Sequence, residues 1–291
     1  NEISLEEARK IDPRYEVDDI VETEVTPRNF GRIAAQNAKQ VVVQRIREAE
    51  RGMVFEKFSS RENDIVTGII QRMENKNVYI DLGKAEAILT PNEQIPGEIY
   101  QYHDRMKTYI VEVKKTSKGP QIMVSRTHPG LLKRLFELEV PEIHDGLVEI
   151  KSVAREPGMR SKISVYTKDE NIDPVGACVG HKGMRVQTIV NELRGEKIDI
   201  VKYSSEPDQY VANALSPAKV VSTEVLEEEK ICRVIVPDYQ LSLAIGKEGQ
   251  NARLAAKLTG WKIDIKSESQ AAEEAEQGAQ EVGVAYEADE D

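Results

Sequence analysis

The segment Val179-Gly180-His181-Lys182-Gly183 has a second copy in this chain, Ile245-Gly246-Lys247-Glu248-Gly249, at an offset of 66 residues (246 − 180). A closing apolar run follows each copy, Ile198-Asp199-Ile200 after the first and Ile263-Asp264-Ile265 after the second. Because the glycines, the apolar residue before them and the closing run recur together, we conclude that the chain contains an internal repeat.

The residues around both copies predict the same order of elements: a helix, two strands, two short helices joined at the glycines, and a strand. In the first copy these are the helix Pro129–Glu139 and the strands Gly146–Ala154, Lys162–Thr167 and Lys197–Tyr203. In the second copy they are the helix Asp208–Leu215 and the strands Val220–Leu226, Ile231–Val236 and Trp261–Lys266. A GxxG loop in this context is typical of the KH module, whose loop clamps the backbone of about four nucleotides.

The glycine loops are the candidate RNA contacts. Without Cβ atoms the phosphates can approach the backbone, and the amides that begin the following helix point at them. The predicted RNA-binding residues are Gly180, His181, Lys182, Gly183 and Arg185 in the first copy, and Gly246, Lys247, Gly249, Asn251 and Arg253 in the second. A single GxxG is equally explained as a helix–helix turn in which glycine supplies a positive φ. Glu248 is unfavourable beside phosphate, so we interpret its side chain as pointing away.

An apolar groove beside each loop is expected to face the bases. The candidates are Ile172, Val175 and Val179 in the first copy, and Leu241 and Ile245 in the second. Each of them is as well explained as a core residue.

Five short strand-like runs precede the repeat and suit a five-stranded oligonucleotide-binding barrel. They are Val66–Ile70, Val78–Gly83, Ala85–Leu89, Tyr109–Val113 and Gln121–Val124. If Val78, Ile80 and Leu82 fill the interior, Tyr79 stands on the outer face, where an aromatic ring can stack on a base. The alternative is an ordinary exposed tyrosine.

The two ends of the chain have different compositions. Near the N-terminus, Ile33, Val41, Val42 and Ile46 belong to an apolar stripe at helical spacing, which predicts a long amphipathic helix packed against its own domain. From Glu268 to Asp291 there are nine acidic and no basic residues, which predicts a disordered acidic tail. The net charge of −11 therefore leaves about −2 for the rest of the chain (−11 + 9), so the acidic average does not exclude a nucleic-acid binder.

Composition and motifs exclude several classes of protein. No apolar run is long enough to cross a membrane, and the residues after Asn1 do not form a signal peptide. The two cysteines, Cys178 and Cys232, are far apart, which favours a reducing cytoplasm and free thiols. We find no nucleophile, Walker or metal-ligand motif, so we expect no enzyme, no metal and no cofactor. The start at Asn1 rather than Met is interpreted as processing or, preferably, as a fragment lacking its upstream part.

Several motifs resemble the NusA family of bacterial transcription elongation, termination and antitermination factors. Val153–Gly158, Asp173–Gly180 and Arg194–Ile200 are similar to the first KH domain of that family, and Leu243–Asn251 resembles its second. The run Val78–Gly83 resembles its S1-type barrel.

The resemblance implies an α+β multidomain fold: a helical N-terminal remnant, a five-stranded S1 barrel of the oligonucleotide-binding type and two tandem KH domains. The expected boundaries are 1–57 for the polymerase-binding region, 58–127 for the barrel, 128–203 and 204–267 for the KH domains, and 268–291 for the tail. The implied partners of this monomer are nascent single-stranded RNA, RNA polymerase and other antitermination factors, with effects on pausing, termination and antitermination.

Two other functions remain open from the sequence. S1 and KH modules also occur together in RNA-degradation complexes, where an accessory subunit would co-purify with nucleases rather than with polymerase. A protein-binding adaptor would show no salt-dependent affinity for RNA.

Overall fold

The computed structural model describes residues 2–22, 30–117, 119–274 and 276. The chain divides into two units, Asn1–Met53 and Val54–Asp291, which are described separately. In the first unit, α1 (Leu5–Ile11) begins at Ser4, whose hydroxyl accepts a hydrogen bond from the Glu7 amide. The same unit contains most of the long helix α2 (Phe30–Ser59).

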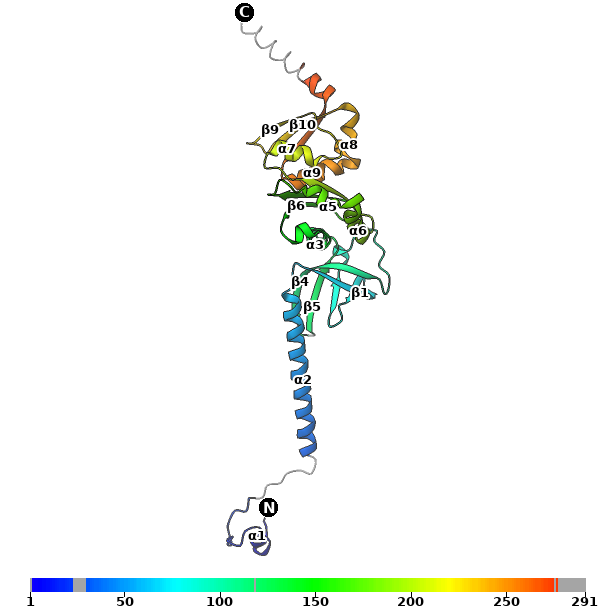
Figure 1. Ribbon diagram of the computed structural model, residues 1–291. Helices are drawn as coiled ribbons and strands as arrows, with labels where there is room; N and C mark the ends of the chain where they lie inside the picture. Colours follow the sequence, from blue (N-terminus) through cyan, green and yellow to red (C-terminus); the bar gives the residue numbers. More distant parts are fainter. Residues whose placement is uncertain (1, 23–29, 118, 275, 277–291) are drawn as a thin grey trace, which may run out of the picture. The chain divides into compact units, whose positions relative to one another are not determined.

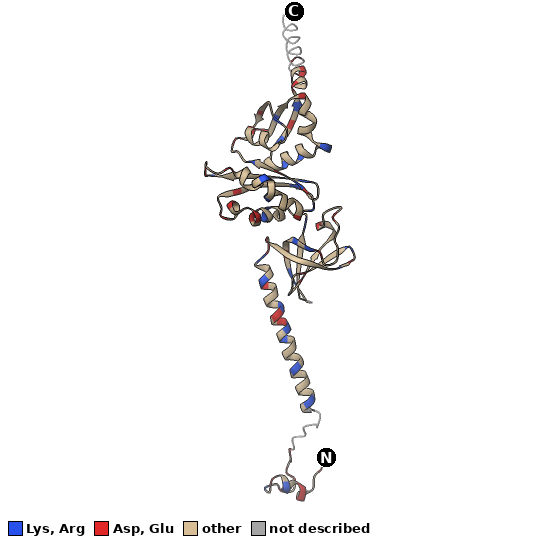
Figure 2. Cartoon of the chain, turned by 45° about the vertical axis from the view of Figure 1, so that its right-hand side comes forward, with Lys and Arg blue, Asp and Glu red and all other residues tan. Residues whose placement is uncertain are grey.

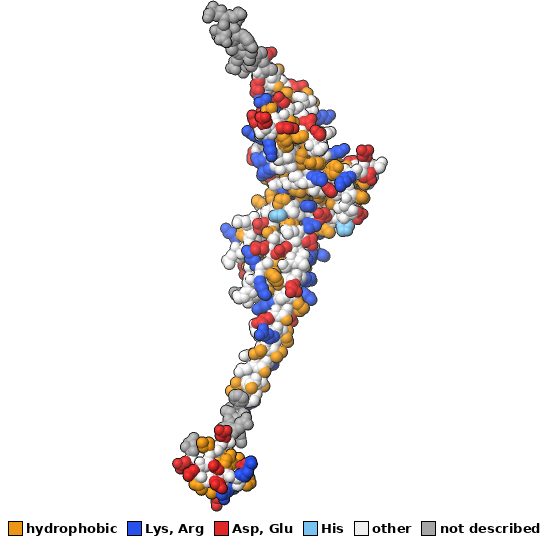
Figure 3. Space-filling view, turned by 90° about the vertical axis from the view of Figure 1, so that its left-hand side faces the viewer, with side chains coloured by type: hydrophobic (Ala, Val, Ile, Leu, Met, Phe, Trp, Pro, Cys, Tyr) orange, Lys and Arg blue, Asp and Glu red, His pale blue; other side chains and the backbone are white. Residues whose placement is uncertain are grey.

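The apolar stripe of α2 is exposed. Relative exposure is 57% for Ile33, 60% for Val41 and 52% for Ile46, and Figure 3 shows hydrophobic side chains on the surface of this helix. The prediction that the stripe packs against its own domain is therefore wrong for these residues. Helical spacing reports that one face is apolar, but it cannot report whether a second layer is present to cover that face.

The barrel lies at the start of the second unit (Figure 1). Its strands are β1 (Ile65–Glu74), β2 (Asn77–Asp81), β3 (Glu86–Leu89), β4 (Arg105–Thr116) and β5 (Gly119–Ser125), and the 3-10 helix η1 (Pro91–Glu93) follows β3. They close in the order β1-β2-β3-β5-β4, which confirms the predicted five-stranded barrel. Val78, Ile80 and Leu89 are among the buried interior residues, and Phe58 at the end of α2 packs against the same cluster.

The first KH domain has two layers, helices on a three-stranded sheet. Its elements are α3 (Pro129–Glu139), α4 (Pro141–His144), β6 (Val148–Glu156), β7 (Arg160–Thr167), α5 (Pro174–Val179), η2 (His181–Gly183), α6 (Met184–Glu192) and β8 (Lys197–Lys202). The sheet order is β6-β7-β8, with β7 and β8 parallel.

The second KH domain repeats this arrangement and confirms the predicted α+β fold. Its elements are α7 (Pro207–Ala214), β9 (Ser222–Leu226), β10 (Ile231–Val236), η3 (Asp238–Gln240), α8 (Leu241–Ile245), η4 (Lys247–Gly249), α9 (Gln250–Thr259) and β11 (Lys262–Ser267). The sheet order is β9-β10-β11, with β10 and β11 parallel.

The beginning of the acidic tail is ordered. Residues 268–274 are helical, so the predicted disorder is wrong for this stretch, while residues 277–291 lie outside the described residues. The Ser267 hydroxyl accepts from the Gln270 amide at the start of this helix, and Lys266 pairs with Glu274. These local contacts order residues that composition alone would leave unfolded.

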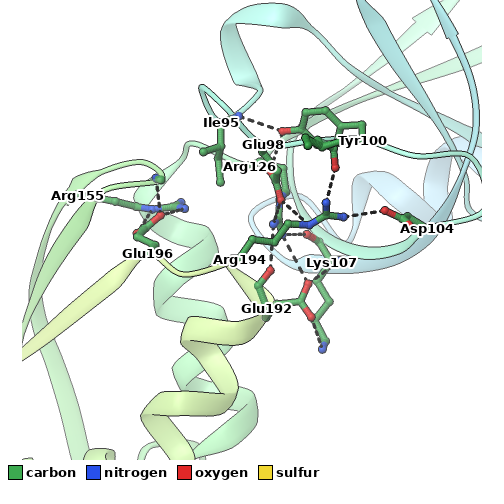
Figure 4. Close-up of polar contacts among 12 residues, drawn as sticks. Ile95, Glu98, Tyr100, Asp104, Lys107, Arg126, Arg155, Glu192, Arg194 and Glu196 are labelled. Carbon is green, nitrogen blue, oxygen red and sulfur yellow. Dashed lines mark hydrogen bonds and ion pairs between the residues drawn. The ribbon is translucent and has the colours of Figure 1, made fainter.

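Charged side chains join the barrel to the first KH domain, as Figure 4 shows. Arg126 at the end of β5 is 1% exposed, and its guanidinium donates to the Glu98 carboxylate and to the Glu192 carbonyl of α6. Arg194, just after α6, reaches back to Asp104 of the barrel. Because a buried guanidinium needs its partners, this joint fixes one domain on the other.

The second KH domain lies on the open face of the first domain's sheet. Ala154 of β6 and Val201 of β8 belong to the same apolar cluster as Val211 of α7 and Leu254 of α9. The fully buried Lys162 of β7 donates to the Ser216 carbonyl at 2.8 Å and to Asp199 at 3.0 Å. The two KH domains are therefore joined by an apolar cluster and by a buried lysine that bridges them.

Candidate nucleic-acid interface

The two glycine loops have the same backbone conformation. Gly180 has φ 75° and ψ 176°, and its counterpart Gly246 has φ 78° and ψ 170°. Lys182 and Glu248, at equivalent positions, have φ 51° and 54°. Both loops thus present the same turn, which is the geometry that a duplicated phosphate clamp requires.

The first glycine of each loop is required by both conformation and space. Its φ is positive, and a Cβ on Gly180 would lie 2.6 Å from Cγ of Arg185. A Cβ on Gly246 would lie 2.7 Å from the backbone nitrogen of Asn251. A side chain at Gly246 would collide with the backbone at the start of α9, and one at Gly180 would displace the Arg185 side chain, so glycine keeps each loop close to the helix that follows it.

Arg185 and Asn251 occupy equivalent positions, five residues after the first glycine, and both side chains fold back on the preceding helix. Arg185 donates to the Ala177 carbonyl at 2.6 Å and pairs with Glu142 at 2.9 Å. Asn251, 3% exposed, donates through Nδ2 to backbone carbonyls of the chain. Its acceptors are the carbonyls of Leu215, Leu243 and Ala244. In the structure these side chains hold the loop in shape, and their contact with RNA stays a prediction.

The cations available at the loops are fewer than the sequence suggested. His181, Lys182 and Lys247 are exposed and form no ion pair among the described residues. Arg253 instead donates to Glu156 of the first KH domain at 2.6 Å. Basic and acidic segments are interspersed over both KH domains in Figure 2, so local side chains, and not a uniformly basic face, define the candidate surface.

The predicted groove residues divide between core and surface. Ile172 and Val175 are half-buried against the core of the first KH domain, and Leu241 packs in the same way in the second. Ile245 is 37% exposed beside its loop. Val179, at the equivalent position of the first loop, is half-buried, so both residues that precede the loops keep some exposed apolar surface.

On the barrel, Tyr79 of β2 and Arg72 of the neighbouring strand β1 have their side chains in contact. Val78 and Ile80 are buried and Tyr79 is half-buried, as the alternation predicts. The guanidinium of Arg72, which is opposite Tyr79 in the β1–β2 pairing, lies 4.2 Å from the ring centroid. Sequence reasoning missed Arg72, because only the strand register places it on the ring. The two side chains form a stacking pair that can extend onto a base.

We predict that Tyr79→Ala weakens single-stranded RNA binding by about 1–3 kcal/mol, the usual contribution of one stacked base. The melting temperature should change little, because the side chain is only half-buried. Fluorescence anisotropy with a labelled RNA measures the affinity. Tyr102→Ala, which removes a 57% exposed tyrosine of the same barrel, is the matched control. Equal affinity of the Tyr79 variant and the native chain would exclude a stacking role.

Models of known families match four consecutive parts of the chain. The NusA N-terminal domain matches residues 1–52 and the S1 RNA binding domain matches 59–125. The NusA-like first KH domain matches 126–203 and the NusA-like second KH domain matches 207–273. A protein of Halalkalibacterium halodurans named "Transcription termination/antitermination protein NusA" is 71% identical over 94% of this chain and 71% of its own length. The chain belongs to the NusA family.

Other NusA proteins show the same relationship. The Bacillus subtilis protein of the same name is 70% identical over 94% of this chain and 73% of its own length. The Thermus thermophilus protein is 47% identical over 90% of this chain and 68% of its own length. A solved structure, the crystal structure of APE1850, matches 45% of this chain and 93% of its own with a TM-score of 0.35, which is too low to support an argument.

The NusA-like motif Val153–Gly158 covers the end of β6 and the turn that follows it. Arg155 and Glu196 are 1% and 0% exposed in their side chains and form a bidentate pair at 2.8 Å. Glu196 also accepts a hydrogen bond from the Gly158 amide, and this bond fixes the turn that contains Glu156 and Gly158. Burial raises the pKa of Glu196, but the hydrogen bonds and charge of Arg155 outweigh this and lower the pKa overall.

This turn contacts all three domains of the second unit. Glu156 accepts hydrogen bonds from Arg253 and Gln250 of the second KH domain. The pKa of the Glu156 carboxyl is lowered, mainly by the hydrogen bond from Arg253. Gly158 faces Ile95 of the barrel so closely that an added Cβ would lie 2.5 Å from its Cγ2. A family motif in the sequence thus marks the place where the domains meet.

Two further features bear on the chemistry of the described residues. They contain no group of three His, Cys, Asp or Glu side chains arranged to hold a metal ion. Among the same residues no helix combines the length and the apolar character needed to span a membrane.

Proposed function

We propose that this NusA-family chain binds single-stranded nascent RNA and acts with RNA polymerase to modulate pausing, termination and antitermination. The observation that carries the proposal is the pair of glycine loops with the same backbone conformation, each next to exposed cationic side chains and each beside the core of its own KH domain. The S1 and KH family matches and the names of the relatives support it.

In this proposal the chain has no catalytic role and works as a cytoplasmic monomer. The barrel and the KH domains hold the RNA strand, and region 1–57 contacts RNA polymerase, with other antitermination factors as further partners. The exposed apolar stripe of α2 supports the second assignment, because a helix face of this kind is usually covered by a partner.

Transcription with purified RNA polymerase on a template with a hairpin terminator tests the function. The native chain should change the fraction of read-through transcripts. A chain with His181→Asp and Lys182→Asp should lose most of that effect, since its RNA contact is removed while α2 is unchanged. If the native chain leaves read-through and pausing unaltered, or if it co-purifies with nucleases instead of polymerase, the proposal fails.

Polymerase docking is tested on α2. Val41→Asp with Ile46→Asp should weaken association with RNA polymerase but leave RNA affinity unchanged, because both side chains are more than half exposed. Gln36→Asp with Gln40→Asp adds the same charge to polar positions of the same helix and serves as the control. Equal polymerase binding of all three proteins in size-exclusion chromatography would contradict the assignment of this region.

A further inference from the structure

A cavity of about 400 Å³ lies where the second glycine loop faces the first KH domain. One wall consists of Met159, Arg160 and Lys197 of the first KH domain. The second KH domain contributes the other lining residues, which are Pro217, Ser242, Leu243, Gly246, Lys247, Gln250 and Asn251. The cavity therefore exists only because the two domains are joined, and its volume is in the range of sites that hold small ligands.

The repeat explains why this space is open at the second loop. The residue equivalent to Asn251 in the first KH domain is Arg185, whose longer side chain extends to Glu142 of α4. Asn251 is shorter, and its amide is used within its own domain, on the carbonyls of Leu215, Leu243 and Ala244. Asn251 thus fixes the position of Leu243 without filling the cavity.

The walls combine apolar surface with unpaired positive charge. Met159 is 59% exposed and Leu243 is 47% exposed, although both line the cavity. Arg160 is committed to Asp199 through two hydrogen bonds at 2.7 and 2.8 Å. Lys197 and Lys247 are exposed, and neither forms an ion pair among the described residues. Apolar faces beside two free ammonium groups match the base and the phosphate of a nucleotide.

We propose that this cavity, here named the junction slot, holds one nucleotide of the RNA strand between the stretches bound by the two glycine loops. The base packs between Met159 and Leu243, and the phosphate lies against Lys197 and Lys247. The inference rests on the proposed RNA-binding function. It adds a contact that neither KH domain has by itself, so the joined pair binds RNA more tightly than two independent clamps on one strand.

The test uses the full chain and a labelled single-stranded RNA of about 12 nucleotides, long enough for two clamps of about four nucleotides and a connecting segment. Met159→Ser with Leu243→Ser should weaken binding about tenfold, because two apolar walls are lost. The loss should nearly disappear with an RNA that has abasic nucleotides at its four central positions, since that RNA has no base to place in the slot. Lys197→Gln should reduce the magnitude of the salt slope by about 0.7, the value for one phosphate on a single strand.

Matched controls separate the slot from general surface effects. Leu138→Ser with Leu147→Ser changes two exposed leucines of the first KH domain outside the cavity, and Lys133→Gln removes an exposed lysine of α3. Both should bind like the native chain. If the wall variant binds the intact and the abasic RNA as the native chain does, or loses equal affinity for both, the junction slot is wrong. If the native chain does not bind the RNA, or the glycine-loop variants bind normally, the proposed function itself has failed.

Discussion

Replacing His181 and Lys182 by Asp should weaken single-stranded RNA binding by roughly ten- to hundredfold. A charge-assisted contact contributes about 1.5–3 kcal/mol, and the new carboxylates repel the phosphate that the helix start would otherwise attract. The turn should survive, because both glycines remain and Asp tolerates the left-handed conformation of position 182 better than most residues. Anisotropy titrations at several salt concentrations measure the affinity and the salt slope.

The second loop provides an internal comparison. Lys247→Asp with Glu248→Asp should weaken binding less, because Glu248 already places one carboxylate where the first loop has Lys182. The chain with both loops changed should bind more weakly than either single-loop variant. Circular dichroism and melting should match the native chain in all cases. Native RNA affinity in a folded chain with both loops changed would disprove the tandem clamp.

The second large effect concerns stability. Glu196→Gln should destabilise the first KH domain by about 3–5 kcal/mol at neutral pH, because it leaves the buried Arg155 guanidinium without a counter-charge. Thermal unfolding followed by circular dichroism or calorimetry should show a lower melting temperature. Glu224→Gln, which breaks an ion pair with both side chains more than half exposed, should change stability by less than about 1 kcal/mol.

The effect of Glu196 should also depend on pH. Its pKa is lowered in the folded chain, so its stabilising contribution is complete above the ordinary carboxyl pKa and is lost as pH falls through the folded-state value. The difference in melting temperature between the native chain and Glu196→Gln should therefore shrink in strongly acidic buffer. A difference that is constant from neutral to acidic pH would show that the charge of Glu196 is not what stabilises the domain.

Local patterns in the sequence were sufficient for the elements and the loops. The helix Pro129–Glu139 and the strand Ile231–Val236 have the predicted bounds, since capping, proline and alternation are properties of neighbouring residues. The positive φ of both glycine pairs follows from the same local chemistry. The repeat itself predicted that both loops share one conformation.

The roles of individual charged side chains did not follow from the sequence. The sequence predicted Arg185 and Arg253 as cations that contact RNA near the loops. In the structure Arg185 is paired with Glu142, and Arg253 is paired with Glu156. The contact of Arg72 with Tyr79 could not be predicted from the sequence, because it depends on the strand register. The cavity at Met159 and Leu243 could not be predicted either, because it forms where two domains meet.

The sequence by itself determined the modules of this protein, their order and the two glycine loops, because turn and helix geometry depend on residues close in the chain. The tertiary structure decided which cations remain free, what Arg155 and Glu196 hold together, and that α2 keeps its apolar stripe exposed. The physical reason is that charge pairing and burial are set by residues distant in sequence, and a linear pattern does not specify which of several possible partners is within reach.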